Sequence, residues 1–329
     1  MILFSLVLQN AYAQDPQYTQ YYNAPLYLNP AFVGLTDAGR VGTNYRVQGT
    51  NDDSRFTTFS LYGDYFIEDY NASAGVLLLQ DKEEFNGFRY NSVAIPISYQ
   101  FQINEKLVLK PALQGSFNTR RIDFSNILFG DQLDASGNVV GESIESLRAG
   151  NNVSYADLAF GILTYTDKLW AGASVHNILE QNISFVEGGN SVLPVRYSFH
   201  GGYRFGIKKQ SLSRSRETIY MPTFSYVKQG PFDQLDVGLI AIFRPIIIGT
   251  MFRGVPIGGS TKKAVAVLAG VEMFNFSFGY SFDFVLDNAT DPGGIHELSL
   301  SYLFNLNKND PPGKSKRLRC PIPINQFKY

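Results

Sequence analysis

Ser174 and His176 are the residues whose types and spacing most resemble a catalytic pair. A hydroxyl beside an imidazole can act as nucleophile and base, as in an outer-membrane lipid hydrolase. Both lie in an alternating segment that predicts a strand, so their side chains share one face about 6–7 Å apart. That separation exceeds the hydrogen-bond reach of about 2.6–3.2 Å that proton transfer needs. The sequence therefore favours a structural histidine and no enzyme activity, with the hydrolase as an alternative.

Metal and phosphate sites are weakly supported. The three histidines (His176, His200 and His296) fall on separate predicted strands, and no pair has the spacing of metal ligands. The acidic loop 287–294 offers oxygen ligands for Ca²⁺ but lacks EF-hand spacing. Residues 258–262 have the composition of a phosphate-binding loop without its spacing. We therefore expect no metal and no cofactor.

The composition is unusual for a protein that folds in water. Charged residues make up 17% of the 329 residues, against roughly 25% in an average soluble domain. Aromatic residues reach 14%, and nearly all are Phe or Tyr. The formal net charge of −1 argues against a nucleic-acid-binding protein, which needs a basic surface.

From about residue 39 onward, apolar residues recur at every second position, which predicts strands. In 274–284 every even-numbered residue is Phe or Tyr, whereas the odd-numbered residues are Asn, Ser, Gly, Ser and Asp. No apolar run approaches the ~20 residues of a membrane-spanning helix. The expected strands cover 39–50, 54–66, 71–80, 88–102, 106–120, 153–166, 168–177, 194–206, 217–228, 233–243, 245–254, 264–273, 275–285 and 296–306.

The connections between these strands alternate in length. Four expected connections are very short (103–105, 167, 244 and 274–275), and four that alternate with them are mostly long (81–87, 122–152, 178–193 and 286–295). Outer-membrane barrels have short periplasmic turns and longer outer loops. One connection departs from this pattern: 207–216 is long, although it falls on the side expected to have short periplasmic turns. The pattern predicts an all-β fold, a transmembrane antiparallel β-barrel of about 14 strands over residues 39–306, rather than a soluble periplasmic β-protein.

The barrel interpretation also predicts where each kind of side chain lies. Apolar faces should contact lipid, Ser, Asn, Gln and Gly should line the lumen, and charge should be concentrated in turns, loops and the tail. An even strand number places both termini in the periplasm of a bacterium with an outer membrane.

The chain begins with a segment that resembles an export signal. An apolar run at 2–8 precedes Ala11-Tyr12-Ala13, whose small residues fit a signal-peptidase site before Gln14. A basic start is absent, which leaves open a beginning upstream of Met1, and a buried N-terminal strand is the structural alternative. We interpret residues 1–13 as a signal peptide, and 14–38 as a periplasmic or plug segment.

Three stretches resemble the PorP/SprF family of type IX secretion-associated outer-membrane proteins of Bacteroidetes-type bacteria: QDPQYTQYYNAPLYLNPAFVG (14–34), AGASVHN (171–177) and GIHELSLSY (294–302). The resemblance implies a non-enzymatic outer-membrane barrel. The resemblance also implies a partner, a large type IX-secreted surface protein of the adhesin class, which in some members of the family serves gliding motility. The barrel is expected to bind the C-terminal region of this protein and to anchor it or help its export. Periplasmic or outer-membrane components of the secretion or gliding machinery, membrane lipid and lipopolysaccharide are further expected partners.

Residues 14–34 are too rich in Tyr, Leu and Pro for a free tail, so we expect them to fold into the barrel mouth or lumen. Asn29-Pro30-Ala31 also resembles the N-terminal hatch of the FadL long-chain fatty-acid channel family, so a channel for hydrophobic solutes is the alternative function. The expected plug residues are Tyr21, Tyr22, Asn23, Pro25, Leu28, Asn29 and Pro30.

The long outer loops are the expected partner-binding surface, because loops on a rigid scaffold commonly carry function. The candidate residues there are Asp131, Asp134, Asn138, Asn182, Glu187, Asp287 and Asp291. Residues 307–329 form an expected periplasmic tail with basic residues at 314–319, matched by a second basic loop at 208–216. The tail contains Cys320, the single cysteine of the chain, which is either a buried thiol or a thiol that forms a disulfide with another molecule.

Overall fold

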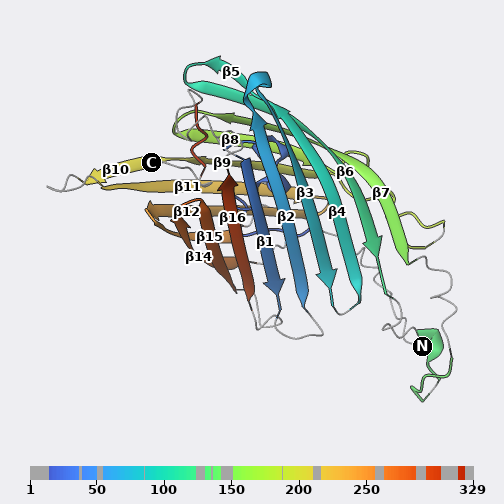
Figure 1. Ribbon diagram of the computed structural model, residues 1–329. Helices are drawn as coiled ribbons and strands as arrows, with labels where there is room; N and C mark the ends of the chain where they lie inside the picture. The colour runs from blue at the N-terminus through green and yellow to red at the C-terminus, as the bar shows by residue number, and fades with distance from the viewer. Residues whose placement is uncertain are drawn as a thin grey trace.

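The computed structural model describes residues 15–36, 39–49, 55–84, 86–123, 130–134, 136–141, 151–186, 188–209, 216–255, 263–286, 294–304 and 318–322. They form one antiparallel sheet that curves into a barrel of tilted strands (Figure 1). Its strands are β1 (Gly39–Gln48), β2 (Phe56–Ile67), β3 (Ala72–Glu83), β4 (Phe88–Tyr99), β5 (Phe101–Asn104), β6 (Leu107–Arg121), β7 (Asn152–Tyr165), β8 (Leu169–His176), β9 (Arg196–Tyr203), β10 (Phe205–Lys209), β11 (Arg216–Gln229), β12 (Phe232–Phe243), β13 (Ile246–Val255), β14 (Ala264–Met273), β15 (Phe276–Val285) and β16 (Ile295–Phe304).

The sheet is closed, because β1 pairs with β16 as well as with β2. β4 and β5 both pair with β6, and β9 and β10 both pair with β11, so each of these two couples forms one interrupted barrel strand. The 16 segments therefore make a 14-strand barrel, which confirms the fold expected from the sequence. In lipid, closure leaves no backbone edge without a partner.

The two ends of the barrel differ. At one end, which we call the turn end, the connections include 105–106, 244–245 and 274–275. The opposite end, the loop end, carries the long connections 122–151 and 177–195, although β11 and β12 are joined there by only 230–231. The chain enters β1 and leaves β16 at the turn end, since Gly39 pairs with Phe304. No helix among the described residues is long and apolar enough to cross a membrane.

The outward face is apolar, as the alternation predicts. Ile95 is 59% exposed, and its neighbour Ala94 is 2% exposed. On β15, Phe278 faces outward and Ser281 is fully buried in the lumen. The assignment of faces from strand parity is confirmed at these positions.

The expected distribution of charge is wrong for the lumen. Many ionisable side chains on strands are buried inside the barrel instead of lying in turns, loops and the tail. They are Arg40, Arg46, Asp64, Lys110, Arg120, Asp157, Arg196, Asp236, Arg253, Asp283 and Glu297. Charged groups are stable in the lumen because they form ion pairs and hydrogen bonds with one another and with the N-terminal segment, which is described below.

An arginine in place of Ile95, near the middle of β4, should destabilise the barrel by ~2–4 kcal/mol, because it places a charge in the lipid. The measurement is the free energy of unfolding from lipid vesicles in denaturant. The control is Asn138→Arg, at an exposed loop position. Equal stability of the two variants would contradict a lipid-facing β4.

Candidate functional site

Residues 15–36, which we call the lumenal segment, lie inside the barrel and run along it from the loop end to the turn end. Asp15 contacts Arg196, the first residue of β9 at the loop end. Gly34 donates its backbone N–H to Asp64, close to the turn end of β2. The segment then enters β1, so it crosses the lumen once before the first strand begins.

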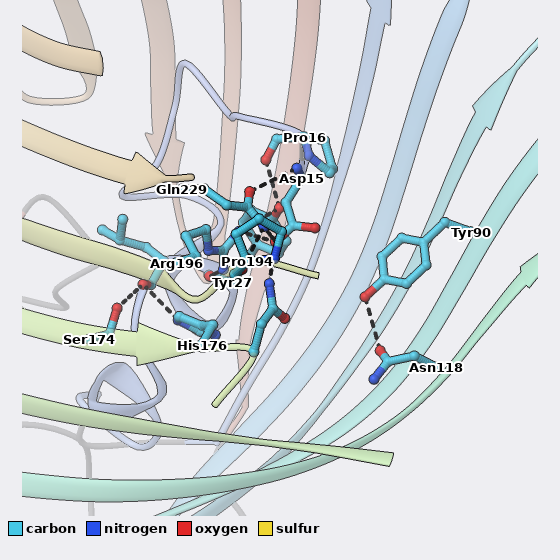
Figure 2. A network of polar contacts seen from close by, with 12 residues as sticks. Asp15, Pro16, Tyr27, Tyr90, Asn118, Ser174, His176, Pro194, Arg196 and Gln229 are labelled. Carbon is cyan, nitrogen blue, oxygen red and sulfur yellow. Dashed lines mark hydrogen bonds and ion pairs between the residues drawn. The ribbon is translucent and has the colours of Figure 1, made fainter. Parts of the chain in front are cut away.

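The loop-end anchor is the carboxylate of Asp15 (Figure 2). Its oxygens lie 3.7 Å from Arg120 Nη2 and 3.5 Å from Arg196 Nη1. The amides of Asn177 and Gln229 donate to Asp15 Oδ2 at 3.1 and 3.2 Å. Two arginines and two amides from four strands or strand ends therefore converge on one carboxylate of the lumenal segment.

Tyr27 connects this anchor to the rest of the segment. Its hydroxyl donates to the carbonyl of Pro16 at 2.6 Å and accepts from Arg196 Nη1 at 2.8 Å. The Arg196 guanidinium also lies over the Tyr27 ring, 4.7 Å from its centroid. The start of the segment and its helical part are thus held against one another by a buried arginine of the barrel wall.

The second anchor is Glu297 on β16. Its two carboxylate oxygens accept the backbone N–H groups of Thr19 and Gln20, at 2.8 and 3.0 Å. Thr19 Oγ1 donates to Asp283 Oδ2 at 2.7 Å, and the Arg253 guanidinium donates to the same oxygen. Hydrogen bonds to charged groups contribute about 1.5–3 kcal/mol each, more than those between neutral groups.

The centre of the lumenal segment forms two short helices, α1 (Pro25–Leu28) and η1 (Pro30–Phe32). Proline at the first helical position explains both starts, because its missing N–H would have no helical partner there. Asn29 caps η1 by accepting from Ala31 N at 2.8 Å, and donates to the carbonyls of Ile162 and Ala173. Asn29 thereby attaches the segment to β7 and β8.

Glycines in the wall make room for this contact. A Cβ atom at Gly161 would lie 2.1 Å from Asn29 Oδ1 and 2.9 Å from Pro30 Cγ. At Gly172 on β8, a Cβ would lie 3.1 Å from Asn29 Nδ2. The Asn29 side chain and the Pro30 ring can approach the wall only because these positions have no side chain.

The third anchor lies at the turn end. Asp64 accepts from Gly34 N at 3.1 Å and forms an ion pair with Arg40 at 2.6 Å. Lys110 donates to the carbonyl of Val33 and to Ser73 Oγ. All three charged groups are buried, so the end of the segment is fixed by charge-assisted hydrogen bonds where it joins β1.

The residues expected to form a plug all lie in the lumenal segment. All but Asn23 are buried, and Asn23 is half-buried with its amide donating to Ser299 Oγ. The middle of the segment contains the buried members of this set, Tyr21, Tyr22, Pro25, Leu28, Asn29 and Pro30. Sequence reasoning missed Asp15 and the groups of the wall that receive it. It also missed Asp283 and Glu297, which bind Thr19 and Gln20; these acidic residues interrupt the small, polar face of their strands, but the sequence does not show whether they meet water or a buried partner.

Ser174 and His176 both contact the carbonyl oxygen of Leu28 in the lumenal segment. Ser174 Oγ donates to the carbonyl of Leu28 at 2.8 Å, and His176 Nε2 lies 3.4 Å from the same oxygen (Figure 2). His200 contacts Asn29 and Ser198, whereas His296 lies on the outward face beside the Tyr280 hydroxyl. Among the described residues, no group of three or more His, Cys, Asp or Glu side chains could hold a metal ion.

Two small cavities border the lumenal segment within the part of the chain that the structure describes. One cavity of about 40 Å³ lies beside Asp15, Tyr90 and His176, and another of about 20 Å³ lies beside Tyr21 and Ser225. A cavity needs roughly 10–15 Å³ to hold one water molecule. These two cavities therefore hold a few water molecules each at most, and no larger solute.

The expected partner-facing residues are at the loop end where the structure describes them. Asp134 accepts the N–H groups of Ser136 and Asn138 and so closes a turn. Asn182 accepts from Ser184 N and Ser191 N and bridges its loop. Asp131 belongs to the short helix η5 (Gly130–Gln132). The remaining three, Glu187, Asp287 and Asp291, lie outside the described residues, as do residues 1–13 and the basic positions 314–317.

The tail is described at 318–322, which lies at the turn end (Figure 1). Cys320 and Ile322 are buried in the same hydrophobic cluster as Val108 and Trp170, which are turn-end residues of β6 and β8. Burial raises the pKa of the Cys320 thiol to about 12. The thiol is therefore a packed, protonated group.

A comparison with protein-family models gives one family, the type IX secretion system membrane protein PorP/SprF, matched over residues 10–302. The chain belongs to the PorP/SprF family. This confirms the resemblance read from the sequence and makes the chain an outer-membrane β-barrel linked to type IX secretion. PorP/SprF is a family of secretion-associated membrane barrels and not a known enzyme family.

Solved structures resemble this PorP/SprF barrel at low identity. The Ralstonia pickettii toluene transporter TbuX is 11% identical, with a TM-score of 0.48, covering 86% of this chain and 94% of that one. The P. putida toluene transporter TodX is 12% identical, with a TM-score of 0.47 and coverages of 87% and 95%. Acinetobacter baumannii Omp33 is 8% identical, with a TM-score of 0.43 and coverages of 82% and 100%. The search of curated proteins finds no match.

Gly161→Ala should displace the lumenal segment, because the added methyl group overlaps Asn29 and Pro30, and overpacking of this kind costs ~1–3 kcal/mol. Single-channel conductance and protease cleavage within residues 15–36 should both rise. The matched control is Gly115→Ala on the neighbouring strand β6, where a Cβ meets nothing within 4 Å. Identical conductance and cleavage in both variants would show that the segment is not held by this contact.

Cys320 in the folded barrel should resist thiol reagents. With a pKa of about 12, about one thiol in ten thousand is ionised at pH 8, and the thiolate is the reactive form. Reaction with Ellman's reagent in mild detergent should be slow, and become rapid after denaturation. Rapid, complete labelling of the folded protein would contradict the buried position.

Proposed function

We propose that this PorP/SprF barrel binds a type IX-secreted cell-surface protein at its loop end, and anchors that protein or assists its export. The observation that carries the proposal is membership of a type IX secretion family over nearly the whole barrel. The proposed partner is a large adhesin that serves gliding motility. The barrel would bind the C-terminal region of this adhesin.

The orientation of the barrel supports a partner on the outer surface. Outer-membrane barrels have short periplasmic turns and longer extracellular loops, so we place the turn end in the periplasm. The tail residues 318–322 then lie on the periplasmic side, where components of the secretion or gliding machinery are accessible. Asp15 lies instead near the outer mouth, so the proposed periplasmic position of the N-terminal segment applies to its last residues, near Gly34.

The lumenal segment favours a binding role over free solute passage. The two cavities described above admit only water-sized molecules, and the lumenal segment is attached at three levels by buried charges. A channel for hydrophobic solutes, the alternative, needs the segment to move. We propose that the segment serves as a plug that keeps the barrel sealed while a partner is bound outside.

The loop surface offers suitable recognition chemistry. Its exposed positions include Asn138 and Asn182, amides that both donate and accept hydrogen bonds. Asp134 holds its turn in a fixed shape through several hydrogen bonds to the backbone and to Asn138. We propose that partner contacts come from the loops that contain Asp131, Asp134, Asn138, Asn182, Glu187, Asp287 and Asp291.

Affinity purification of the tagged barrel from its native outer membrane should recover a large secreted surface protein. Asn138→Lys combined with Asn182→Lys should lower that recovery at least fivefold, because both changes lie in the loop surface. The matched control is Glu105→Lys combined with Asp167→Lys, at exposed turn-end positions. Solute conductance by the unaltered barrel, with no protein recovered, would favour the channel instead.

A further inference from the structure

A row of basic side chains crosses the outward face of the barrel near the loop end. Lys82 on β3 pairs in register with Arg89 on β4, and Arg89 pairs with Arg121 on β6. Adjacent strands lie about 4.8 Å apart, so three cationic groups are lined up side by side. We call these three residues the basic row.

Strand parity places the basic row on the outside of the barrel. The residues next to each member point into the lumen: Asp81 accepts from Thr58, and Arg120 donates to the Tyr155 hydroxyl. Side chains alternate faces along a strand. Arg89 and Arg121 are accordingly exposed, whereas Arg120 is buried.

The basic row lies just beyond the apolar belt. Leu78, Val93 and Phe117 occupy one register row on the same face and are 39%, 47% and 56% exposed. From Leu78 to Lys82 the chain rises about 13 Å along the strand, or about 10 Å along the membrane normal at the usual tilt. The row between them holds Gln80 and Asn91, joined by a hydrogen bond of 2.9 Å.

This order of apolar, amide and basic rows matches the order of chemistry at a membrane surface, where acyl chains give way to glycerol or sugar and then to phosphate. Positions near the interface also tolerate Arg and Lys at a cost of about 0–1 kcal/mol. The basic row therefore lies where lipid phosphates are expected.

The register of the row leaves its charges unbalanced. The outer positions of the same row are Thr57 and Asn152, which are uncharged. Like charges on neighbouring strands destabilise a sheet. The nearest acidic residues along these strands, Glu84 and Asp123, lie outside the row, two residues closer to the loops than Lys82 and Arg121. Lys228 on β11 provides a contrast, because its register partner is Asp233. An external anion can therefore balance the basic row, whereas Lys228 already has a carboxylate as its register partner.

We propose that the basic row binds the phosphate groups of an anionic glycolipid in the outer leaflet. Arg89 and Arg121 suit this role, because a guanidinium binds phosphate through two parallel hydrogen bonds. The acyl chains of the lipid would lie on Leu78, Val93 and Phe117. The proposal rests on the placement of the loop end at the outer surface and is independent of any protein partner.

The experiment measures binding of diphosphorylated lipid A to the purified full-length barrel in neutral detergent, by native mass spectrometry. R89Q combined with R121Q should weaken binding at least tenfold, whereas K228Q should leave it unchanged. Heat-modifiable gel migration checks that each variant is folded. Undiminished lipid A binding by the folded R89Q/R121Q barrel would overturn the proposal.

Two further measurements distinguish the proposed glycolipid from two other ligands of the basic row, a phospholipid and a protein. Phosphatidylglycerol, an anionic phospholipid, should bind more weakly than lipid A, and equal binding would show that the row does not select a glycolipid. In native membranes, R89Q/R121Q should still recover the secreted protein. Loss of that protein with lipid A binding intact would instead assign the row to a protein partner, whereas loss of lipid alone leaves the proposed secretion role standing.

Discussion

The structure depends on how a wide barrel fills its interior. A barrel of about eight strands can be filled by its own side chains, whereas barrels of 16–18 strands leave an aqueous channel. With 14 strands, this barrel lies between those two sizes. The lumenal segment occupies its interior, where Leu26, Phe32 and Val33 are fully buried. Interior filling therefore comes from the chain that precedes the first strand.

The same segment solves an electrostatic problem. Charges taken out of water need partners, because the cost of desolvation is several kcal/mol for each ion. Among the strand residues that the structure describes, six buried side chains are basic and five are carboxylates: Arg40, Arg46, Lys110, Arg120, Arg196 and Arg253, with Asp64, Asp157, Asp236, Asp283 and Glu297. Asp15 adds a sixth carboxylate beside Arg120 and Arg196. The backbone N–H groups of Thr19 and Gln20 occupy both oxygens of Glu297. Barrel wall and segment therefore stabilise one another.

This arrangement has consequences for function. In the proposed function, a segment held by polar groups at the loop end, the centre and the turn end keeps the barrel closed and leaves the outer loops available to a partner. Its contacts are hydrogen bonds and ion pairs in a confined space, so water or a competing polar ligand can replace them one at a time. The outward face follows a different rule, since its apolar belt ends in amide and basic rows suited to a membrane surface.

Much of the fold could be predicted from the sequence because alternation with period two is a local property. The aromatic positions of 274–284, the short connections at 244 and 274–275, and the family resemblance at 14–34 each report on the barrel without knowledge of any distant contact. Strand boundaries were predicted to within a few residues for the same reason, since the pattern of each strand continues to its last outward residue.

The candidate site could be predicted only in part. The prolines and tyrosines of residues 14–34 indicated a segment that would not remain free in water, but charge inside the lumen was missed. A single Asp or Arg on a polar face, such as Asp283 or Arg196, looks the same in sequence whether it meets water or a buried partner. The partners of such residues lie far away in the chain. Gln229, for example, donates to Asp15, and Thr19 donates to Glu297.

The sequence by itself determined the strands, their faces and the family of this protein, because each is written in local periodicity or contiguous motifs. Only the tertiary structure decided which charges are paired, how the lumenal segment crosses the barrel, and that Lys82, Arg89 and Arg121 form one row. Those features arise from strand register and closure, which bring together residues that no local pattern relates.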